Sequence, residues 1–232
     1  MLSLRLKVLL AGFFSQLLCL GVARFAYTPL LPLMQQQSIL DDASGGYLAA
    51  VNYLGYMSGA LLAASLNSLS LKDRLYRLGL LLAIVSTLGM ALTENIWLWA
   101  FWRYLAGLSS AGSMLIASGL ILHWLLQHKL RAELGVHFAG LGLGIALAAL
   151  AVELMLWLDF DWRQQWYLLA LLGVALAIPA WRWLPPPVLI SSAQQQTAAL
   201  PEPGRRFIRL MLCVYFGAGY GYVVTATFIV TI

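Results

Sequence analysis

The sequence predicts an all-α integral membrane protein, and three observations support this class. Hydrophobic residues make up 62% of the 232 residues, charged residues only 10%, and the mean hydropathy is +0.83. A soluble domain carries about 25% charged residues, so this composition excludes an ordinary water-soluble globule and a disordered chain. Apolar runs of about 20 residues, enough to cross a bilayer, recur along the chain. Lys and Arg gather in alternate connections between these runs.

The apolar runs predict about seven membrane-spanning helices. They cover approximately residues 8–34, 46–69, 75–93, 97–124, 134–157, 166–184 and 207–232. The first run is too long for the apolar part of a signal peptide, and it ends in Pro29 and Pro32 rather than in a cleavage site of small residues. It is therefore the first span.

The spans divide the chain into three parts. Residues 1–184 form a domain of six spans with short loops. Residues 185–206 are rich in Pro, Ser and Gln and are typical of a solvated cytoplasmic linker. Residues 207–232 form a seventh span, which reaches Ile232 without the polar or aromatic flank that normally ends a span. We therefore expect a truncated chain; the alternative is a natural seven-span protein.

The connections also predict the orientation of the chain. Basic residues lie before the first span and in every second connection after it: Arg5, Lys7, Lys72, Arg74, Arg77, Lys129, Arg131, Arg182, Arg205, Arg206 and Arg209. The opposite loops hold Asp41, Asp42, Glu94, Asp159 and Asp161, with Arg163 as the single base. By the positive-inside rule, the N-terminus faces the cytoplasm, and we expect a multi-pass protein of a bacterial-type plasma (inner) membrane.

Three charged residues lie deep inside the predicted spans. Arg24 lies about 16 Å from the outer end of the first span, near the middle of the membrane. Arg103 lies about two turns inside the fourth span, and Glu153 lies at a similar depth in the fifth. A charge at such a depth costs about 2.5–3.5 kcal/mol on insertion scales, so it should face a cavity or a partner. Each arginine is then part of an anionic-substrate or coupling site, or it forms a salt bridge or carbonyl cap that holds the bundle together. Glu153 is then a proton-coupling group, or the counter-ion of an arginine, or a side chain that reaches the outer interface.

Polar side chains near these charges could line a cavity within the membrane. Tyr27 shares a helix face with Arg24, and Asn52 and Tyr56 cluster in the second span. Packing with the hydroxyl bonded to the backbone is the alternative for each tyrosine. His123 and His137 lie near the cytoplasmic ends of their spans, where an interfacial position is the simpler interpretation.

Several functional classes lack their motifs here. The Lys and Arg residues form no continuous stripe for nucleic acid. There is no phosphate-binding glycine loop, HExxH or Gly-x-Ser-x-Gly motif, and no spacing suited to a metal, so we expect neither an enzyme nor a cofactor. The GxxxG pairs Gly55/Gly59, Gly140/Gly144 and Gly217/Gly221 instead indicate close helix packing.

Several motifs carry a family resemblance. Residues 21–32, GVARFAYTPLLP, residues 53–56, YLGY, and residues 219–228, GYGYVVTATF, resemble the YbfB/YjiJ-type proteins of the major facilitator superfamily (MFS). Asp73 and Arg74 resemble the core of the superfamily's cytoplasmic loop motif, and Arg103 with Gly107 resembles its Arg-x-x-x-Gly motif in span four. The resemblance implies an N-terminal six-helix half built from 3+3 inverted repeats, plus a seventh helix.

The same resemblance implies secondary active transport by alternating access. The matching arginine of the family is tied to proton coupling, so Arg103 joins Glu153 as a coupling candidate, and Asp73 and Arg74 form a conformational loop motif. Solute would be contacted from this half by Arg24, Tyr27, Asn52, Tyr56 and Arg103. A buried guanidinium favours a small anionic solute.

The expected partners are the solute, protons, the lipid bilayer and the missing C-terminal half. The alternative is a truncated membrane protein that does not transport, or an assembly partner. It stays open because an isolated half provides only one wall of a pathway.

Overall fold

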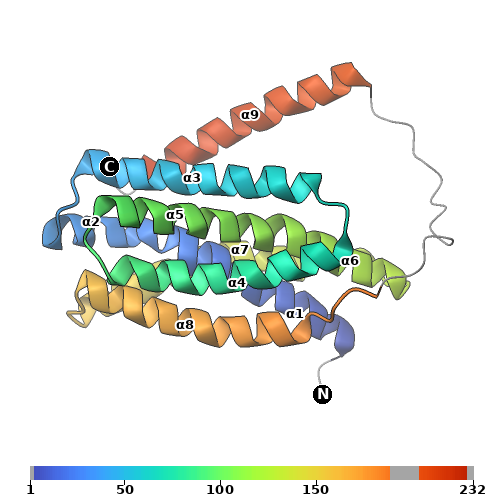
Figure 1. Cartoon of the computed structure of the whole chain (residues 1–232), viewed down its shortest axis with the longest axis horizontal. Helices are drawn as coiled ribbons and strands as arrows, with labels where there is room; N and C mark the ends of the chain where they lie inside the picture. Colours follow the sequence, from blue (N-terminus) through green and yellow to red (C-terminus); the bar gives the residue numbers. More distant parts are fainter. Residues whose placement is uncertain (1–2, 189–203, 229–232) are drawn as a thin grey trace. The chain divides into compact units, whose positions relative to one another are not determined.

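The computed structural model describes residues 3–188 and 204–228, with side chains as far as Gly221. The described chain consists of helices and forms two units, Met1–Pro187 and Val188–Ile232 (Figure 1). The second unit contains one described helix, α9 (Arg205–Phe228). Most of the predicted linker, and the last residues of the predicted seventh span, lie outside the described residues.

The first unit contains six helices that are long and apolar enough to cross a membrane. Span 1 consists of α1 (Leu4–Gln16), the π-helical segment η1 (Leu17–Phe25) and α2 (Tyr27–Gln37). Spans 2 and 3 are α3 (Asp42–Ser65) and α4 (Leu69–Ala91). Span 4 consists of α5 (Ile96–Ala111), the π-helical segment η2 (Gly112–Ile116) and α6 (Ala117–Gln127). Spans 5 and 6 are α7 (Gly135–Trp157) and α8 (Trp162–Trp183). These helices confirm the predicted all-α membrane fold.

Polar caps, rather than the limits of the apolar runs, set the helix boundaries. The carboxylate of Asp41 accepts a hydrogen bond from the backbone N–H of Ser44 at 2.8 Å, which starts α3. Hydrogen bonding from Ser44 also holds the pKa of the Asp41 carboxyl below its usual range. Ser68 caps α4 in the same way, so α3 ends at Ser65 and α4 begins at Leu69. The apolar run predicted for residues 46–69 crosses this cap because leucines lie on both sides of it.

The six spans pack in a pattern that two equivalent halves would produce. Span 1 packs against span 5, and span 4 packs against span 2. Spans 3 and 6 contact each other, span 3 contacts span 4, and span 6 contacts span 1. Exchanging spans 1–3 with spans 4–6 converts the pairing of spans 1 and 5 into that of spans 4 and 2, and the pairing of spans 3 and 4 into that of spans 6 and 1. It leaves the pairing of spans 3 and 6 unchanged. These contacts are those expected of a 3+3 inverted repeat.

Glycines allow the closest of these approaches. A Cβ at Gly107 on α5 would lie 2.0 Å from the carbonyl oxygen of Asn52 on α3. A Cβ at Gly21 in η1 would lie 2.6 Å from the carbonyl oxygen of Gly144 on α7. The predicted pairs Gly55/Gly59 and Gly140/Gly144 are confirmed as close helix contacts, because they lie at these same two interfaces.

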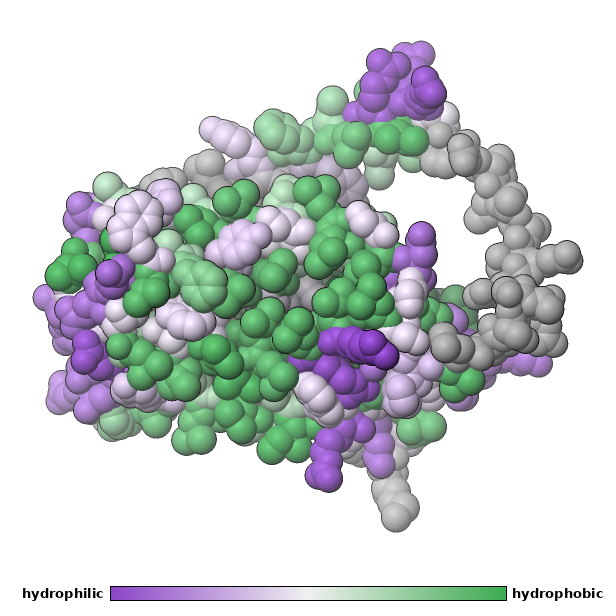
Figure 2. Space-filling model, in the orientation of Figure 1, coloured by the Kyte–Doolittle hydropathy of each residue, from purple (hydrophilic) through white to green (hydrophobic). Residues whose placement is uncertain are grey.

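Burial differs strongly between the spans. The most apolar windows of spans 1 and 4 are 72% and 61% buried, whereas those of α3 and α7 are each 22% buried. Hydrophobic side chains cover much of the face of this bundle shown in Figure 2. Spans 1 and 4 therefore form the interior of the six-span unit.

Gly107→Ala should destabilise the protein, because the added methyl group collides with the backbone of α3. We expect a loss of about 1–3 kcal/mol, the usual cost of overpacking, seen as a lower midpoint of thermal unfolding in detergent. Gly142→Ala on α7 is the matched control, since its Cβ would have no neighbour within 4 Å. Equal midpoints for the two variants would contradict the close approach of α3 and α5.

Candidate functional site

A buried arginine joins span 4 to the backbone of span 1. Arg103 on α5 is only 3% exposed. Its Nη1 donates hydrogen bonds to the carbonyl oxygens of Ala23 and Arg24, both at 3.2 Å. Its guanidinium carbon also lies 4.2 Å from the ring centre of Tyr27, which is within the range of a cation–π contact.

The backbone of span 1 changes register next to these carbonyls. The π-helical segment η1 ends at Phe25, and the N–H of Ala26 still bonds five residues back, to Gly21, at 2.9 Å. Pro29 has no N–H, so it cannot bond to the carbonyl of Phe25 in α-helical register or to that of Arg24 in π register. Arg103 supplies a donor to the carbonyl of Arg24 from outside the helix.

The second buried arginine is surrounded by aromatic rings. Arg24 lies in η1 and is 7% exposed. Its guanidinium carbon lies 5.2 Å from the ring centre of Phe25, 4.8 Å from that of Tyr53 and 4.6 Å from that of Tyr56. The structure therefore brings Tyr56 and Tyr53, both from α3, to Arg24.

Two further predicted residues hold the backbones around this pair. The hydroxyl of Tyr27 donates to the carbonyl of Gly45 at 2.9 Å, joining span 1 to span 2. Nδ2 of Asn52 donates to the carbonyl of Arg103 at 2.8 Å, joining span 2 to span 4. Both side chains are buried, and each donates its hydrogen bond to a backbone carbonyl. Their geometry is that of positioning residues around the arginines.

Glu153 lies apart from this cluster. It is exposed on α7 and, within the described part of the chain, forms no ion pair or hydrogen bond with Arg103. The structure thus does not bring the two coupling candidates together. A role of Glu153 in proton transfer stays a prediction.

The loop motif forms its contacts through a different arginine from the one predicted. Asp73 accepts two hydrogen bonds from Arg77, each at 3.0 Å. Arg77 also donates to the carbonyls of Trp181 at 2.9 Å and Leu184 at 3.1 Å, at the end of α8. Arg74 is exposed. The spacing of four residues between Asp73 and Arg77 could have indicated this pair.

His137 is buried, so the interfacial position expected for it is wrong. Its side chain is 0% exposed and its Nε2 lies 3.1 Å from Nε2 of Gln16 and 2.9 Å from Oγ of Ser118. His137 precedes Gly140 by three residues and so shares the helix face that packs on span 1. That spacing is the signal in the sequence that could have placed it inside.

One comparison identifies similar proteins. A family model described as "Uncharacterised MFS-type transporter YbfB" matches residues 16–232. The comparison with curated proteins finds no match. Within the residues that the structure describes, no group of three His, Cys, Asp or Glu side chains could hold a metal ion.

Arg77→Gln should destabilise the packing of α4 on α8, because it removes the ion pair with Asp73 and two bonds to backbone carbonyls. We expect a loss of about 1–3 kcal/mol in the free energy of unfolding, measured by thermal unfolding in detergent. Arg74→Gln removes the same charge from an exposed position and serves as the control. The assignment is wrong if the two variants are equally stable.

Proposed function

Because the chain belongs to the MFS-type transporter family YbfB, we propose that it forms the N-terminal half of a secondary transporter for a small anionic solute. The pair of buried guanidinium groups is the observation that supports an anionic solute. Arg103 donates to the backbone carbonyl of Arg24, so both charges belong to one region of the bundle. An intramembrane charge is costly and is normally retained for function.

The chemistry of the two arginines matches a carboxylate. A guanidinium binds a carboxylate through two parallel N–H···O bonds, which are shorter and stronger than neutral hydrogen bonds. The rings of Tyr53 and Tyr56 lie beside Arg24, and in the described chain their hydroxyls make no hydrogen bond. They can therefore donate to the same solute, while Tyr27 and Asn52 hold the surrounding backbones.

Transport would proceed by alternating access. In this mechanism the solute binds near the middle of the membrane, and the two halves of the transporter rock around it. The half described here supplies one wall, and the C-terminal half would begin with the predicted seventh span. The basic residues at the end where α1 begins support a cytoplasmic N-terminus.

Proton coupling is part of the proposal. Glu153 is exposed on α7, so its carboxyl group can exchange protons with water in a pathway beside this helix. Arg103 would respond to the solute through its contacts with span 1. The solute would then act on spans 1 and 4, and the proton on span 5, which packs against span 1.

Arg24→Gln should lower solute transport at least about tenfold, because loss of a charge-assisted hydrogen bond costs about 1.5–3 kcal/mol. The measurement is counterflow of radiolabelled acetate, benzoate, succinate and citrate in proteoliposomes that contain the full-length protein. Arg163→Gln is the control, since Arg163 lies at the surface in an ion pair with Glu94.

Unchanged counterflow of every transported acid in Arg24→Gln would contradict the binding role. No counterflow of any of the four acids by the unaltered protein would contradict the anionic solute. It would favour the alternative, a membrane protein that does not transport or an assembly partner.

A further inference from the structure

A second polar cluster lies between spans 1, 4 and 5, away from the arginine pair. Its centre is His137 on α7, with Gln16 on α1 and Ser118 on α6 bonded to the imidazole Nε2. Ser113 in η2 donates to Oε1 of Gln16 at 3.4 Å and to Oγ of Ser15 at 3.2 Å. These polar side chains are buried or partly buried, inside a bundle that is otherwise apolar.

The hydrogen bonds of the imidazole are incomplete. Nδ1 of His137 is buried and has no hydrogen-bond partner among the described residues. It points at Gly12, where a Cβ would lie 2.2 Å from it. The carbonyl of Gly12 already accepts a hydrogen bond from Oγ of Ser15 at 2.7 Å. One ring nitrogen is therefore held by the network, and the other is available.

The network can serve the imidazole in more than one protonation state. When Gln16 donates its amide N–H to Nε2, the imidazole proton sits on Nδ1. When the amide of Gln16 rotates, its oxygen accepts from an Nε2–H, and Nδ1 becomes a free base. Ser118 donates to the carbonyl of Met114, so its oxygen can accept from Nε2–H as well.

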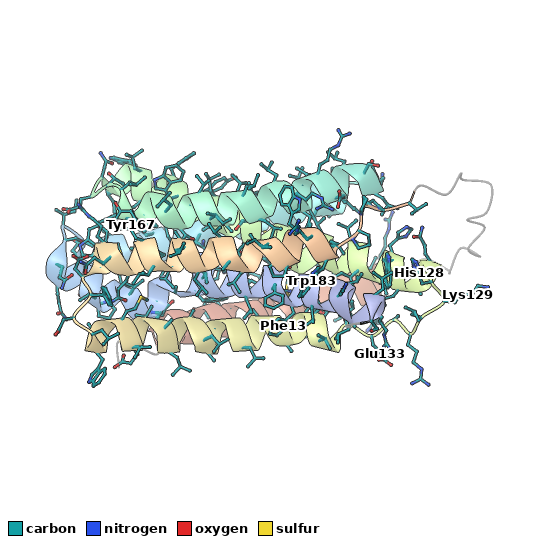
Figure 3. The ribbon with its side chains drawn as sticks, turned by 90° about the horizontal axis from the view of Figure 1, so that it is seen from below. Phe13, His128, Lys129, Glu133, Tyr167 and Trp183 are labelled. Atoms are coloured by element: carbon teal, nitrogen blue, oxygen red, sulfur yellow. The ribbon has the colours of Figure 1, made fainter. Side chains whose placement is uncertain are left out.

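A cavity of about 550 Å³ lies at the end of the bundle where α1 begins, and its lining includes Arg5, Leu9, Glu133 and Val136. Val136 is the neighbour of His137 in the chain, and Leu9 lies one turn before Gly12. Figure 3 shows Glu133 at the same end of the bundle as Lys129 and at the end opposite to Tyr167. The cavity thus lies at the end of α7 that carries His137, although the imidazole itself is buried and is not part of the lining.

We propose that His137 is a proton-binding site, loaded and emptied from the end of the bundle where this cavity lies. A hydronium ion that reaches the imidazole would give it one proton, leaving water and an imidazolium ion, and the reverse step would release it. This inference rests on the proposed transport function, to which it adds a second proton-binding group in addition to Glu153. An ionisable group buried in a membrane bundle is a functional candidate by default.

The other charged and titratable groups near His137 do not change its assignment as the proton-binding group. On the elements packed against α7, and on α6, they are Arg5, Lys7, Cys19, Arg24, Tyr27 and His123. None of them forms a hydrogen bond or ion pair with His137. Glu133, one turn earlier in the chain, is paired with Arg5 at 2.8 Å. Among the described side chains that are hydrogen-bonded around His137, the imidazole is therefore the titratable group.

Further polar contacts lie along the interface of spans 1 and 4, between the network of His137 and the proposed solute site. Ser110 on α5 donates to the carbonyl of Cys19 in η1 at 2.9 Å, between Ser113 and Arg103 in span 4. Polar contacts between spans 1 and 4 thus run from Gln16 to Arg24, through both π-helical segments. A change of protonation at one end can act on the packing that holds the other.

The first experiment titrates His137 directly in the full-length protein, labelled with ¹⁵N-histidine and placed in lipid nanodiscs. We expect one imidazole signal to change from neutral to protonated as the pH is lowered from about 8 to about 4, and to be absent from His137→Gln. His123→Gln is the matched control and should retain that signal. A His137 signal that stays neutral over the whole range would overturn the proposal.

A combined His123→Gln/His128→Gln variant removes the other two histidines of residues 1–232 and leaves His137 unaltered, so a retained signal belongs to neither of them, even if His137→Gln does not fold. This titration needs no solute, and its result stands whether or not the transport proposal holds.

The second experiment uses any carboxylate for which the unaltered protein shows counterflow. A gradient of one pH unit supports about tenfold accumulation for each coupled proton. His137→Gln should lose that accumulation and keep counterflow, because counterflow needs no net proton movement. Accumulation equal to that of the unaltered protein would contradict a coupling role.

Discussion

Inside a bilayer each backbone carbonyl needs a donor from the protein itself, and this requirement organises the centre of the structure. Span 1 changes from π-helical to α-helical register just before Pro29, which has no N–H to donate to the carbonyl of Arg24; Arg103 donates to that carbonyl from another helix. The guanidinium of Arg103 meets that need and lies against the ring of Tyr27. Since Asn52 bonds to the carbonyl of Arg103, one residue joins spans 1, 2 and 4.

Close helix approach makes these long-range bonds possible. Gly107 lies one turn after Arg103 and lets α3 come near enough for Asn52 to reach α5. Gly140 lies one turn after His137, and a Cβ there would lie 2.5 Å from the carbonyl of Phe13. Both polar clusters therefore sit next to a glycine contact. In a membrane, where lipid is as apolar as leucine, such packing and interhelical hydrogen bonds replace the hydrophobic effect as the force that joins helices.

The sequence predicts how deep a residue lies in the membrane better than it predicts which way its side chain points. Apolar runs locate the six spans, and a charge within such a run identifies Arg24 and Arg103 as buried. The same reasoning places Glu153 at the depth of Arg103, but the glycine face of α7 turns toward span 1 and leaves Glu153 exposed. His137 lies near a helix end, which favours the interface, yet α1 begins early enough, at Leu4, to cover that turn of α7. Such contacts depend on how two helices meet, which one sequence does not specify.

In the proposed mechanism, the arrangement of the two arginines links solute binding to helix geometry. Both groups lie at the junction of spans 1 and 4, the most buried spans of the six. A shift of span 4 along span 1 would move the donor away from the carbonyls of Ala23 and Arg24, and would also change the distance between the two positive charges. A bound anion that bridges them stabilises one position of the spans over the other. By thermodynamic linkage, the position of the spans then sets the affinity for the anion to the same degree, which is the property that alternating access requires.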